Sequence, residues 1–324
     1  PAGEAPVRDA PRAFLRGGVM NLPRLSLAYL KARPLNTALN VILLALGVAK
    51  GLVVLGLLLL MRTGLVSFGQ GLYYGLGAYA AALLANFAGW TDAAVLMLAG
   101  ALAGGVVAAV LGLLLARYRL IFFSMLTLAF SMILYGLLVK SAALGSTDGF
   151  NLHAKTFAGI ALASGAERRV FFAATVVAAF AVAWAIHWLL RGRWGRLSTA
   201  VADNELRVEY LGASAYRVVY VNYVIAAVVA GLGGACAALA VGHVDPEMTY
   251  WTTSGEFVFV AILGGVGNVL APFASSLVFE GLRTIANQYA PNVWQMMLGL
   301  SMLAIIIFLP SGLWSLVQRL RRTA

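Results

Sequence analysis

Long apolar runs separated by short polar segments fill most of the chain and predict its architecture. A helix needs about 20 apolar residues to cross about 30 Å of hydrocarbon. The runs therefore predict about eight transmembrane helices, with one or two runs too short or too rich in glycine for a full crossing. They cover residues 36–61, 65–87, 93–116, 120–139, 170–190, 218–241, 257–269, 272–286 and 293–309.

Glycine and polar residues interrupt two apolar stretches, at residues 64–88 and 256–272. Broken helices at comparable places in two halves are typical of transporters built from inverted repeats, with the transport path at the repeat interface. The sequence therefore predicts an all-α polytopic membrane protein with discontinuous or re-entrant segments and an inverted internal repeat. For any single glycine, close helix packing is the alternative explanation. The residues of these runs predicted to line the path are Ser67, Gln70, Gly264, Gly265 and Gly267.

Composition supports a membrane protein and argues against other classes. Apolar residues make up 62% of the chain and charged residues 11%, which is outside the usual range of soluble globular proteins. The formal net charge is +11, but the basic residues form clusters between apolar runs. That arrangement is typical of membrane topology, so we expect lipid contact and no nucleic-acid partner.

The basic clusters also predict orientation. Residues 1–35 (a basic arm), 191–217 (a loop) and 311–324 (a tail) are rich in arginine, so we expect them, and both termini, on the cytoplasmic side of a transmembrane domain at 36–310. Residues 141–167, which carry few basic residues, are expected outside. An odd number of crossings must then separate the arm from this outer loop, although four apolar runs lie between them. We predict that residues 64–88 are the run that does not cross.

Three sequence blocks carry a resemblance to a known family. They are TGLVSFGQGLYYGLGAYAAALL at 63–84, GRLSTAVADNELRVEYLGASAYRVVYVNYVIAAVVAGLGGA at 195–235 and SGEFVFVAILGGVGNVLAP at 254–272. With these blocks in this order, residues 41–322 resemble the inner-membrane permeases of branched-chain (Liv-type) amino-acid ABC importers. Leu57 departs from the family pattern, which usually has an asparagine there, and this leaves the substrate open.

The resemblance implies a permease of the bacterial cytoplasmic (inner) membrane that works by alternating access. The implied partners are a second homologous permease, two ABC ATPase subunits that bind ATP and Mg²⁺, and a periplasmic or extracellular solute-binding protein. The chain itself would hold no cofactor. The cargo implied is a branched-chain or other hydrophobic amino acid, with urea, amides or small aromatic or aliphatic carboxylates as alternatives. The residues implied to form the coupling helix on the ATPase are Asn204, Glu205, Glu209 and Gly212.

Ionisable residues inside the apolar runs are the remaining candidates. Lys50 lies near the middle of its run and must face a polar interior, pair with an acid or reach the interface. It is predicted to attract a substrate carboxylate or to pair with Glu256 or Glu280. Glu256 matches a family glutamate and is a path candidate as well as a structural carboxylate. Glu280 and Arg283 are three residues apart, which predicts a pair on one helix face.

Enzymatic chemistry has no support in the sequence. The chain has no phosphate-binding loop of the G-x-x-x-x-G-K-[ST] type, and its three histidines are not spaced as metal ligands. We therefore predict neither a catalytic nor a metal site, and ATP hydrolysis on separate chains. A secondary transporter or channel that works alone is the rival class, because it would also have broken helices and intramembrane charge.

Overall fold

The computed structural model describes residues 34–152, 154, 156–161, 167–289, 293–308 and 312–314. The chain divides into two compact units, Pro1–Asn40 and Val41–Ala324. In the first unit, the described residues 34–40 are helical and begin α2 (Pro34–Met61). All but the last two residues of the predicted basic arm, and the end of the basic tail, lie outside the described residues.

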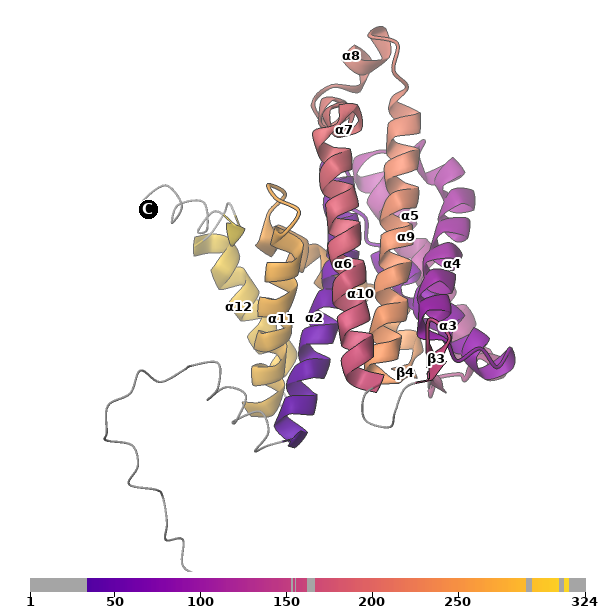
Figure 1. The fold of residues 1–324 in the computed structure, drawn as a ribbon. Coiled ribbons are helices and arrows are strands. Elements are labelled where there is room, and N and C mark those ends of the chain that lie inside the picture. Colours follow the sequence, from indigo (N-terminus) through magenta and orange to yellow (C-terminus); the bar gives the residue numbers. More distant parts are fainter. Residues whose placement is uncertain are drawn as a thin grey trace, which may run out of the picture. The chain divides into compact units, whose positions relative to one another are not determined.

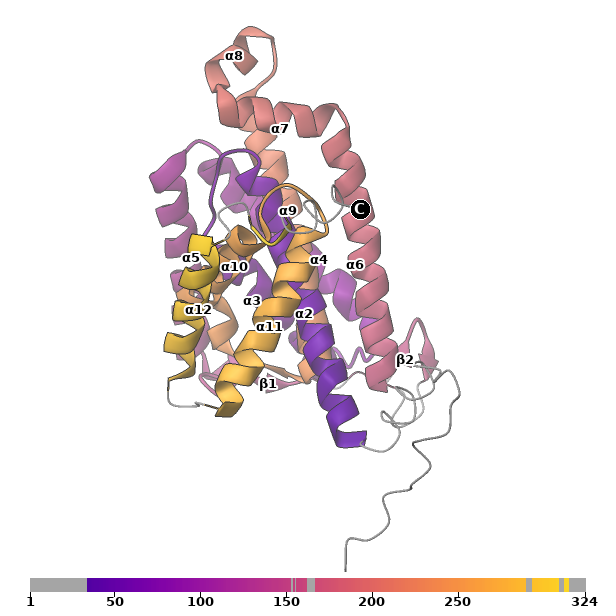
Figure 2. The same cartoon turned by 90° about the vertical axis from the view of Figure 1, so that its left-hand side faces the viewer.

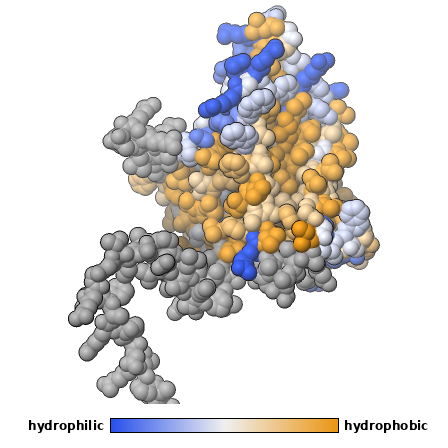
Figure 3. Space-filling model, in the orientation of Figure 1, coloured by the Kyte–Doolittle hydropathy of each residue, from blue (hydrophilic) through white to orange (hydrophobic). Residues whose placement is uncertain are grey.

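The second unit is almost entirely helical, as an all-α membrane protein requires. Five of its helices are long and apolar enough to cross a membrane by length and composition: Val41–Met61, Ala93–Leu115, Leu120–Lys140, Arg169–Arg191 and Ala215–Val241. Apolar side chains form a broad band on the visible face, and hydrophilic side chains gather above it over α7 (Arg193–Asp203) and α8 (Glu205–Tyr210) (Figure 3). The fold is therefore that of a polytopic helical membrane protein.

Two opposite ends of this unit serve as reference points (Figure 1). At one end α7 and α8 project beyond the other helices, and we call this the α7–α8 end. At the other, β1 (Phe150–Asn151) pairs antiparallel with β4 (His243–Val244), and we call this the β1–β4 end. The short elements near the β1–β4 end are η2 (Ala142–Leu144), η3 (Pro246–Thr249) and the hairpin of β2 (Thr156–Phe157) with β3 (Ile160–Ala161).

Four segments run alternately between these ends before residue 141. Val41 of α2 shares a small pocket with Leu239, close to the β1–β4 end, and Gly64, just past the end of α2, lies against Ala202 of α7. The chain then returns through an irregular stretch and α3 (Gln70–Phe87). The ring of Phe87, the last residue of α3, contacts the ring of Phe150 in β1. The helices α4 (Ala93–Leu115) and α5 (Leu120–Lys140) cross to the α7–α8 end and back.

The prediction that residues 64–88 do not cross was therefore wrong, although the predicted interruption is present. The break occupies residues 62–69, and α3 is a regular helix of 18 residues. Extended chain rises about 3.3 Å per residue, roughly twice the rise of a helix, so a short irregular stretch and a shorter helix together cover the distance. As a result, Val41 lies at the same end as residues 141–152.

The second half of the unit continues the alternation. The helices α6 (Glu167–Arg191), α9 (Ala215–Val241), α10 (Trp251–Gly264), α11 (Ala271–Tyr289) and α12 (Trp294–Phe308) follow in order. Besides the five helices of spanning length, α3, α10, α11 and α12 are shorter or less apolar. Leu313, which donates its backbone N–H to Leu263 O, returns to the α7–α8 end. Val41 and Leu313 thus lie at opposite ends, and the predicted location of the two termini stays a prediction because they lie outside the described residues.

An inverted repeat relates α2–α5 to α9–α12. Each half has a long helix, a break, a shorter helix and two further helices, and the two halves run in opposite directions. The packing repeats as well, because Gly231 of α9 lies against Gly100 of α4, and Gly51 of α2 against Phe273 of α11. The two long helices cross at the centre, where a Cβ on Gly56 would lie 2.6 Å from Ala226 O.

The matching breaks are not the two glycine-rich stretches that the sequence suggested. The counterpart of residues 62–69 is the stretch 242–250 before α10, which contains few glycines. Residues 265–270 instead form the turn from α10 to α11, as residues 88–92 form the turn from α3 to α4. Several glycines of α3 serve close packing: Gly77 leaves no room for a side chain beside the Gly231 backbone, and Gly75 lies against Thr249.

Candidate functional site

Four charged side chains meet near the middle of the membrane-spanning helices, and we call them the charged tetrad. Lys50 Nζ donates to Glu280 Oε2 at 2.9 Å and lies 3.8 Å from Glu256 Oε2. Arg283 Nη1 donates to the same Glu256 oxygen at 3.4 Å. Two cations therefore balance two anions, contributed by α2, α10 and α11.

The tetrad answers the predictions made for Lys50. Its side chain is 10% exposed and that of Glu280 is 9% exposed, so the two form a buried ion pair, as predicted. The Lys50 ammonium also lies 6.0 Å from the ring centre of Phe279, at the limit of a cation–π contact. Glu280 pairs with Lys50 of α2 and Arg283 with Glu256 of α10, so each contacts a residue of another helix, and the predicted Glu280–Arg283 pair stays a prediction.

A cavity of about 460 Å³ opens beside Glu256. The Glu256 side chain is 24% exposed, whereas the other acid of the tetrad, Glu280, is 9% exposed. Aromatic and aliphatic side chains form most of the wall, with Gln295 and Thr252 as further polar groups. The remaining lining residues are Trp251, Gly255, Phe259, Phe279, Leu298, Gly299 and Leu303. This cavity, which we call the Glu256 cavity, combines apolar walls with a carboxylate.

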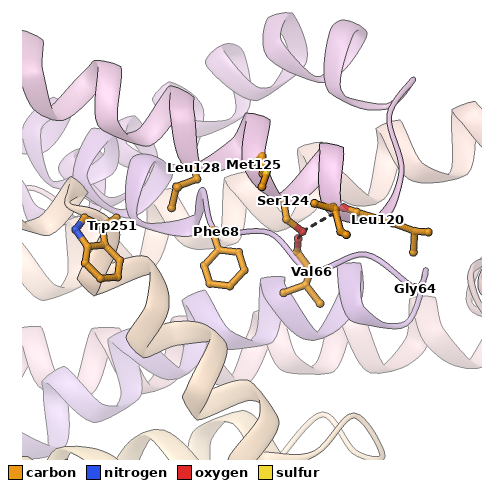
Figure 4. A pocket seen from close by; sticks show the side chains of 9 residues that line it. Gly64, Val66, Phe68, Leu120, Ser124, Met125, Leu128 and Trp251 are labelled. Carbon is orange, nitrogen blue, oxygen red and sulfur yellow. Dashed lines mark hydrogen bonds between the residues drawn. The ribbon is translucent and has the colours of Figure 1, made fainter. Parts of the chain in front are cut away.

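A second hollow, of about 610 Å³, lies between residues 64–68, the start of α5 and Trp251 (Figure 4). Its walls are almost wholly apolar. Ser124 Oγ donates to Val66 O at 2.6 Å and thereby ties the irregular stretch before α3 to α5. Trp251 lines both hollows, so they flank the N-terminus of α10 on the side of the molecule where α5, α10 and α12 lie (Figure 2).

Ser67 and Gln70 lie at the buried N-terminus of α3. Ser67 Oγ accepts from Gly69 N at 3.2 Å, and Ser254 Oγ accepts from Gly71 N at 3.0 Å. The Gln70 amide is fully buried, and neither its oxygen nor its nitrogen has a partner among the described residues. Among the described residues, no hydrogen bond or ion pair joins Ser67 or Gln70 to the charged tetrad. Their place in a transport path stays a prediction.

The predicted path glycines belong to the turn from α10 to α11. Gly264 ends α10, and Gly265 follows in a conformation with φ +79°, which favours glycine. Arg62, after the end of α2, donates to Val266 O at 2.9 Å and to Gly267 O at 3.2 Å. The three glycines therefore lie close to the end of α2, away from Lys50, and their role in a path remains untested.

The four predicted coupling residues all lie on or beside α8. Asn204 Oδ1 accepts from Arg207 N and caps the start of the helix. Glu205 pairs with Arg119 of the turn from α4 to α5. Glu209 is exposed, and Gly212 (φ +83°) follows the end of the helix. Asn204, Glu205 and Gly212 thus have structural roles in shaping and anchoring α8.

Sequence reasoning missed the apolar tip of α8. Leu206, Tyr210 and Leu211 are 66%, 89% and 81% exposed, whereas Val208 between them is buried against the fold. The signal was present, because Leu206 and Tyr210 are four residues apart and share one helix face, whereas Val208 lies on another. Exposed large apolar side chains in a polar region are typical of a protein-binding surface.

A polar relay connects α7 to α9. Trp194 Nε1 donates to Asn222 Oδ1 at 2.9 Å, and Asn222 Nδ2 donates to Ser198 Oγ at 2.8 Å. Together with the Arg119–Glu205 pair, this relay ties the α7–α8 projection to α9 and to the α4–α5 turn. No group of three His, Cys, Asp or Glu residues that could hold a metal ion occurs in the described parts of the chain.

Comparison with known proteins agrees with this geometry. The family model described as "Branched-chain amino acid transport system / permease component" matches residues 39–306. The high-affinity branched-chain amino acid transport system permease protein LivM of Escherichia coli (strain K12) is 29% identical over 277 residues, and LivM of Salmonella typhimurium is 28% identical. The LivH permease of Salmonella typhimurium is 22% identical over 44% of this chain and 49% of its own length.

The coverage of the relatives is partial. The match to each LivM protein covers 78% of this chain and 64% of the relative, so the chain spans less than two thirds of these relatives' length. No solved structure matches the chain. The family model covers far more than half of the sequence, from the start of α2 to α12. The chain therefore belongs to the family of branched-chain amino acid transport system permease components.

Proposed function

We propose that this chain is the membrane-embedded permease subunit of an ATP-driven ABC importer for branched-chain or other hydrophobic amino acids. The observation that carries the proposal is the family match over residues 39–306, which coincides with a fold of two inverted halves. The relatives are named as permeases of branched-chain amino acid transport systems. Two inverted halves with broken helices are typical of transporters that work by alternating access.

Charge supports a cytoplasmic location for the α7–α8 end in the bacterial inner membrane. Basic residues are concentrated there, and the positive-inside rule places such an end in the cytoplasm. The opposite end has few basic residues among those described, including Lys140 and Arg169. The basic residues of the α7–α8 end are Arg62, Arg117, Arg119, Arg191, Arg193, Arg196, Arg207 and Arg217.

The tip of α8 is the proposed contact with the ATPase subunits. Leu206, Tyr210 and Leu211 form an apolar surface at the cytoplasmic end, and Glu209 adds a charge beside it. A push on this tip reaches α5 through the Arg119–Glu205 pair and α9 through the Trp194–Asn222–Ser198 relay. Closure of two ATP-loaded ATPase subunits would thereby move both halves of the permease.

The remaining partners are assigned to other faces. A second, homologous permease would cover the side of α5, α10 and α12, because Glu256 and Gln295 lie at the cavity there and such groups are costly against lipid. A solute-binding protein would deliver the cargo at the β1–β4 end. ATP and Mg²⁺ would be bound by the ATPase subunits.

Co-purification and uptake test this function directly. We expect the tagged chain, expressed with its partner subunits, to bring ATPase chains with it and to support ATP-dependent leucine uptake in vesicles. Tyr210→Ala should reduce both readouts while membrane insertion is unchanged. Tyr289→Ala, which removes an exposed tyrosine at the end of α11, is the matched control. Uptake by the isolated chain without any ATPase would refute the proposal in favour of a secondary transporter.

A further inference from the structure

The Glu256 cavity has the features of a ligand site. We propose that it binds the zwitterionic head group of a hydrophobic amino acid at mid-membrane, with the ammonium on Glu256 and the carboxylate on Arg283, which is not itself a lining residue but contacts the lining residue Glu256 at 3.4 Å. This inference rests on the proposed function and adds to it a binding site within the permease itself. The volume of about 460 Å³ lies within the usual range of about 300–1,000 Å³ for small-molecule pockets.

The distances in the tetrad single out Glu256. Lys50 and Glu280 form a close pair at 2.9 Å, which is the usual length of a charge-assisted hydrogen bond. Glu256 has only longer contacts, at 3.4 Å to Arg283 and 3.8 Å to Lys50. It also lines the cavity and is more exposed than Glu280. A ligand that exchanges the Glu256–Arg283 contact for two contacts of its own would leave the buried Lys50–Glu280 pair intact.

Charge balance selects the class of ligand. The tetrad is neutral, so an incoming net charge would be left uncompensated in surroundings of low polarity. An amino acid is a zwitterion, and it supplies one anion for Arg283 and one cation for Glu256 without changing the total. A carboxylate or an amine alone would add one unbalanced charge. The tetrad therefore favours amino acids over the simple carboxylates that the sequence left open.

The walls of the cavity select an apolar side chain. Beyond Glu256, the lining is formed mainly by the aromatic residues Trp251, Phe259 and Phe279 and the aliphatic residues Leu298 and Leu303. Burial of an apolar side chain against such walls is favourable in proportion to the area removed from water. The combination of one polar corner and apolar walls fits leucine, isoleucine, valine or phenylalanine.

The test measures binding of radiolabelled leucine to the complete complex in nanodiscs, without the solute-binding protein. We expect saturable binding by the unmodified complex, with 4-methylpentanoate and 3-methylbutylamine at least tenfold weaker as competitors. Glu256→Gln should weaken leucine binding at least tenfold. Glu247→Gln is its control, because Glu247 is exposed on η3 and lines none of the cavities described above.

A second variant removes the need to disturb a charge. Gly299 lines the cavity, and a Cβ built there meets no atom within 4 Å, so Gly299→Leu should fill the cavity and improve helix propensity. Gly281→Leu makes the same change on α11, where a Cβ also meets no atom within 4 Å, and serves as its control. We expect Gly299→Leu to abolish leucine binding and Gly281→Leu to leave it unchanged.

The outcomes separate this inference from the proposed function. Leucine binding within twofold of the unmodified complex in both Glu256→Gln and Gly299→Leu would overturn the inference. The inference would also be overturned if the complex takes up leucine but does not bind it without the solute-binding protein. It would likewise be overturned if Gly299→Leu displaces only a co-purified lipid from the cavity and not leucine. Absence of ATP-driven uptake by the unmodified complex would instead refute the proposed function.

Discussion

The buried pair of Lys50 and Glu280 allows a quantitative prediction about stability. At 2.9 Å and an effective dielectric constant of about 20, their attraction is roughly 6 kcal/mol, and that of Lys50 for Glu256 at 3.8 Å is roughly 4 kcal/mol. Lys50→Met leaves two acids with Arg283 as the one cation of the tetrad. We therefore expect the free energy of unfolding to fall by about 3–5 kcal/mol.

The complementary substitution should cost less, and the double substitution least. In Glu280→Gln the Lys50 ammonium keeps Glu256 as a partner, so we expect a loss of about 1–3 kcal/mol. Lys50→Met with Glu280→Gln removes both charges and restores a neutral site. The unfolding free energy of this double variant should lie within about 1–2 kcal/mol of the unmodified protein, because removing a whole buried pair is often nearly neutral.

The assay is unfolding in mixed detergent micelles, followed by the fluorescence of the seven tryptophans. Lys140→Met, on the exposed end of α5, is the control and should change the unfolding free energy by less than about 0.5 kcal/mol. If the effects of Lys50→Met and Glu280→Gln add within about 0.5 kcal/mol in the double variant, the two residues are not coupled and the assigned pairing is incorrect.

Three further predictions concern packing, pH and the end of α8. Gly77→Leu should lower the yield of folded protein in size-exclusion chromatography, because a Cβ at this position overlaps the Gly231 backbone. Such overpacking costs about 1–3 kcal/mol or more. Gly136→Leu is the control and should not lower the yield, because a Cβ there meets no atom within 4 Å. Burial raises the pKa of Asp92, but hydrogen bonds from several backbone N–H groups, including that of Gly159, together outweigh this effect, so the pKa is below its ordinary value. The Asp92 carboxylate therefore stabilises the fold at pH values above its unfolded-state pKa. The difference in unfolding temperature between Asp92→Asn and the unmodified protein should shrink as the pH falls below about 4. A difference that stays constant with pH would contradict this. Gly212→Ala places a side chain on a residue with φ +83°, and this backbone strain costs about 1–2 kcal/mol locally. We expect the substitution to reduce the stimulated ATPase activity of the complex. Unchanged activity would argue against a coupling role of Gly212.

Several features followed from the sequence because they depend on local physical chemistry. The long apolar runs became helices of spanning length, since backbone groups in hydrocarbon must be paired within the segment. Asn204 and Gly212 bound a short helix because one residue caps its start and the other accepts a positive φ. The need of Lys50 for an acidic partner also followed, because an unpaired charge at mid-membrane is costly.

The tertiary structure decided what depends on contacts between distant residues. Lys50 meets Glu280 across 230 residues of sequence, and Arg283 turns to Glu256 although Glu280 lies three residues away, because α2, α10 and α11 pack together at that depth. The crossing of residues 62–87 and the Glu256 cavity likewise depend on where chain segments lie in space. Periodicity and charge counts describe one segment at a time, whereas pairing, direction and cavities arise only when segments are packed against one another.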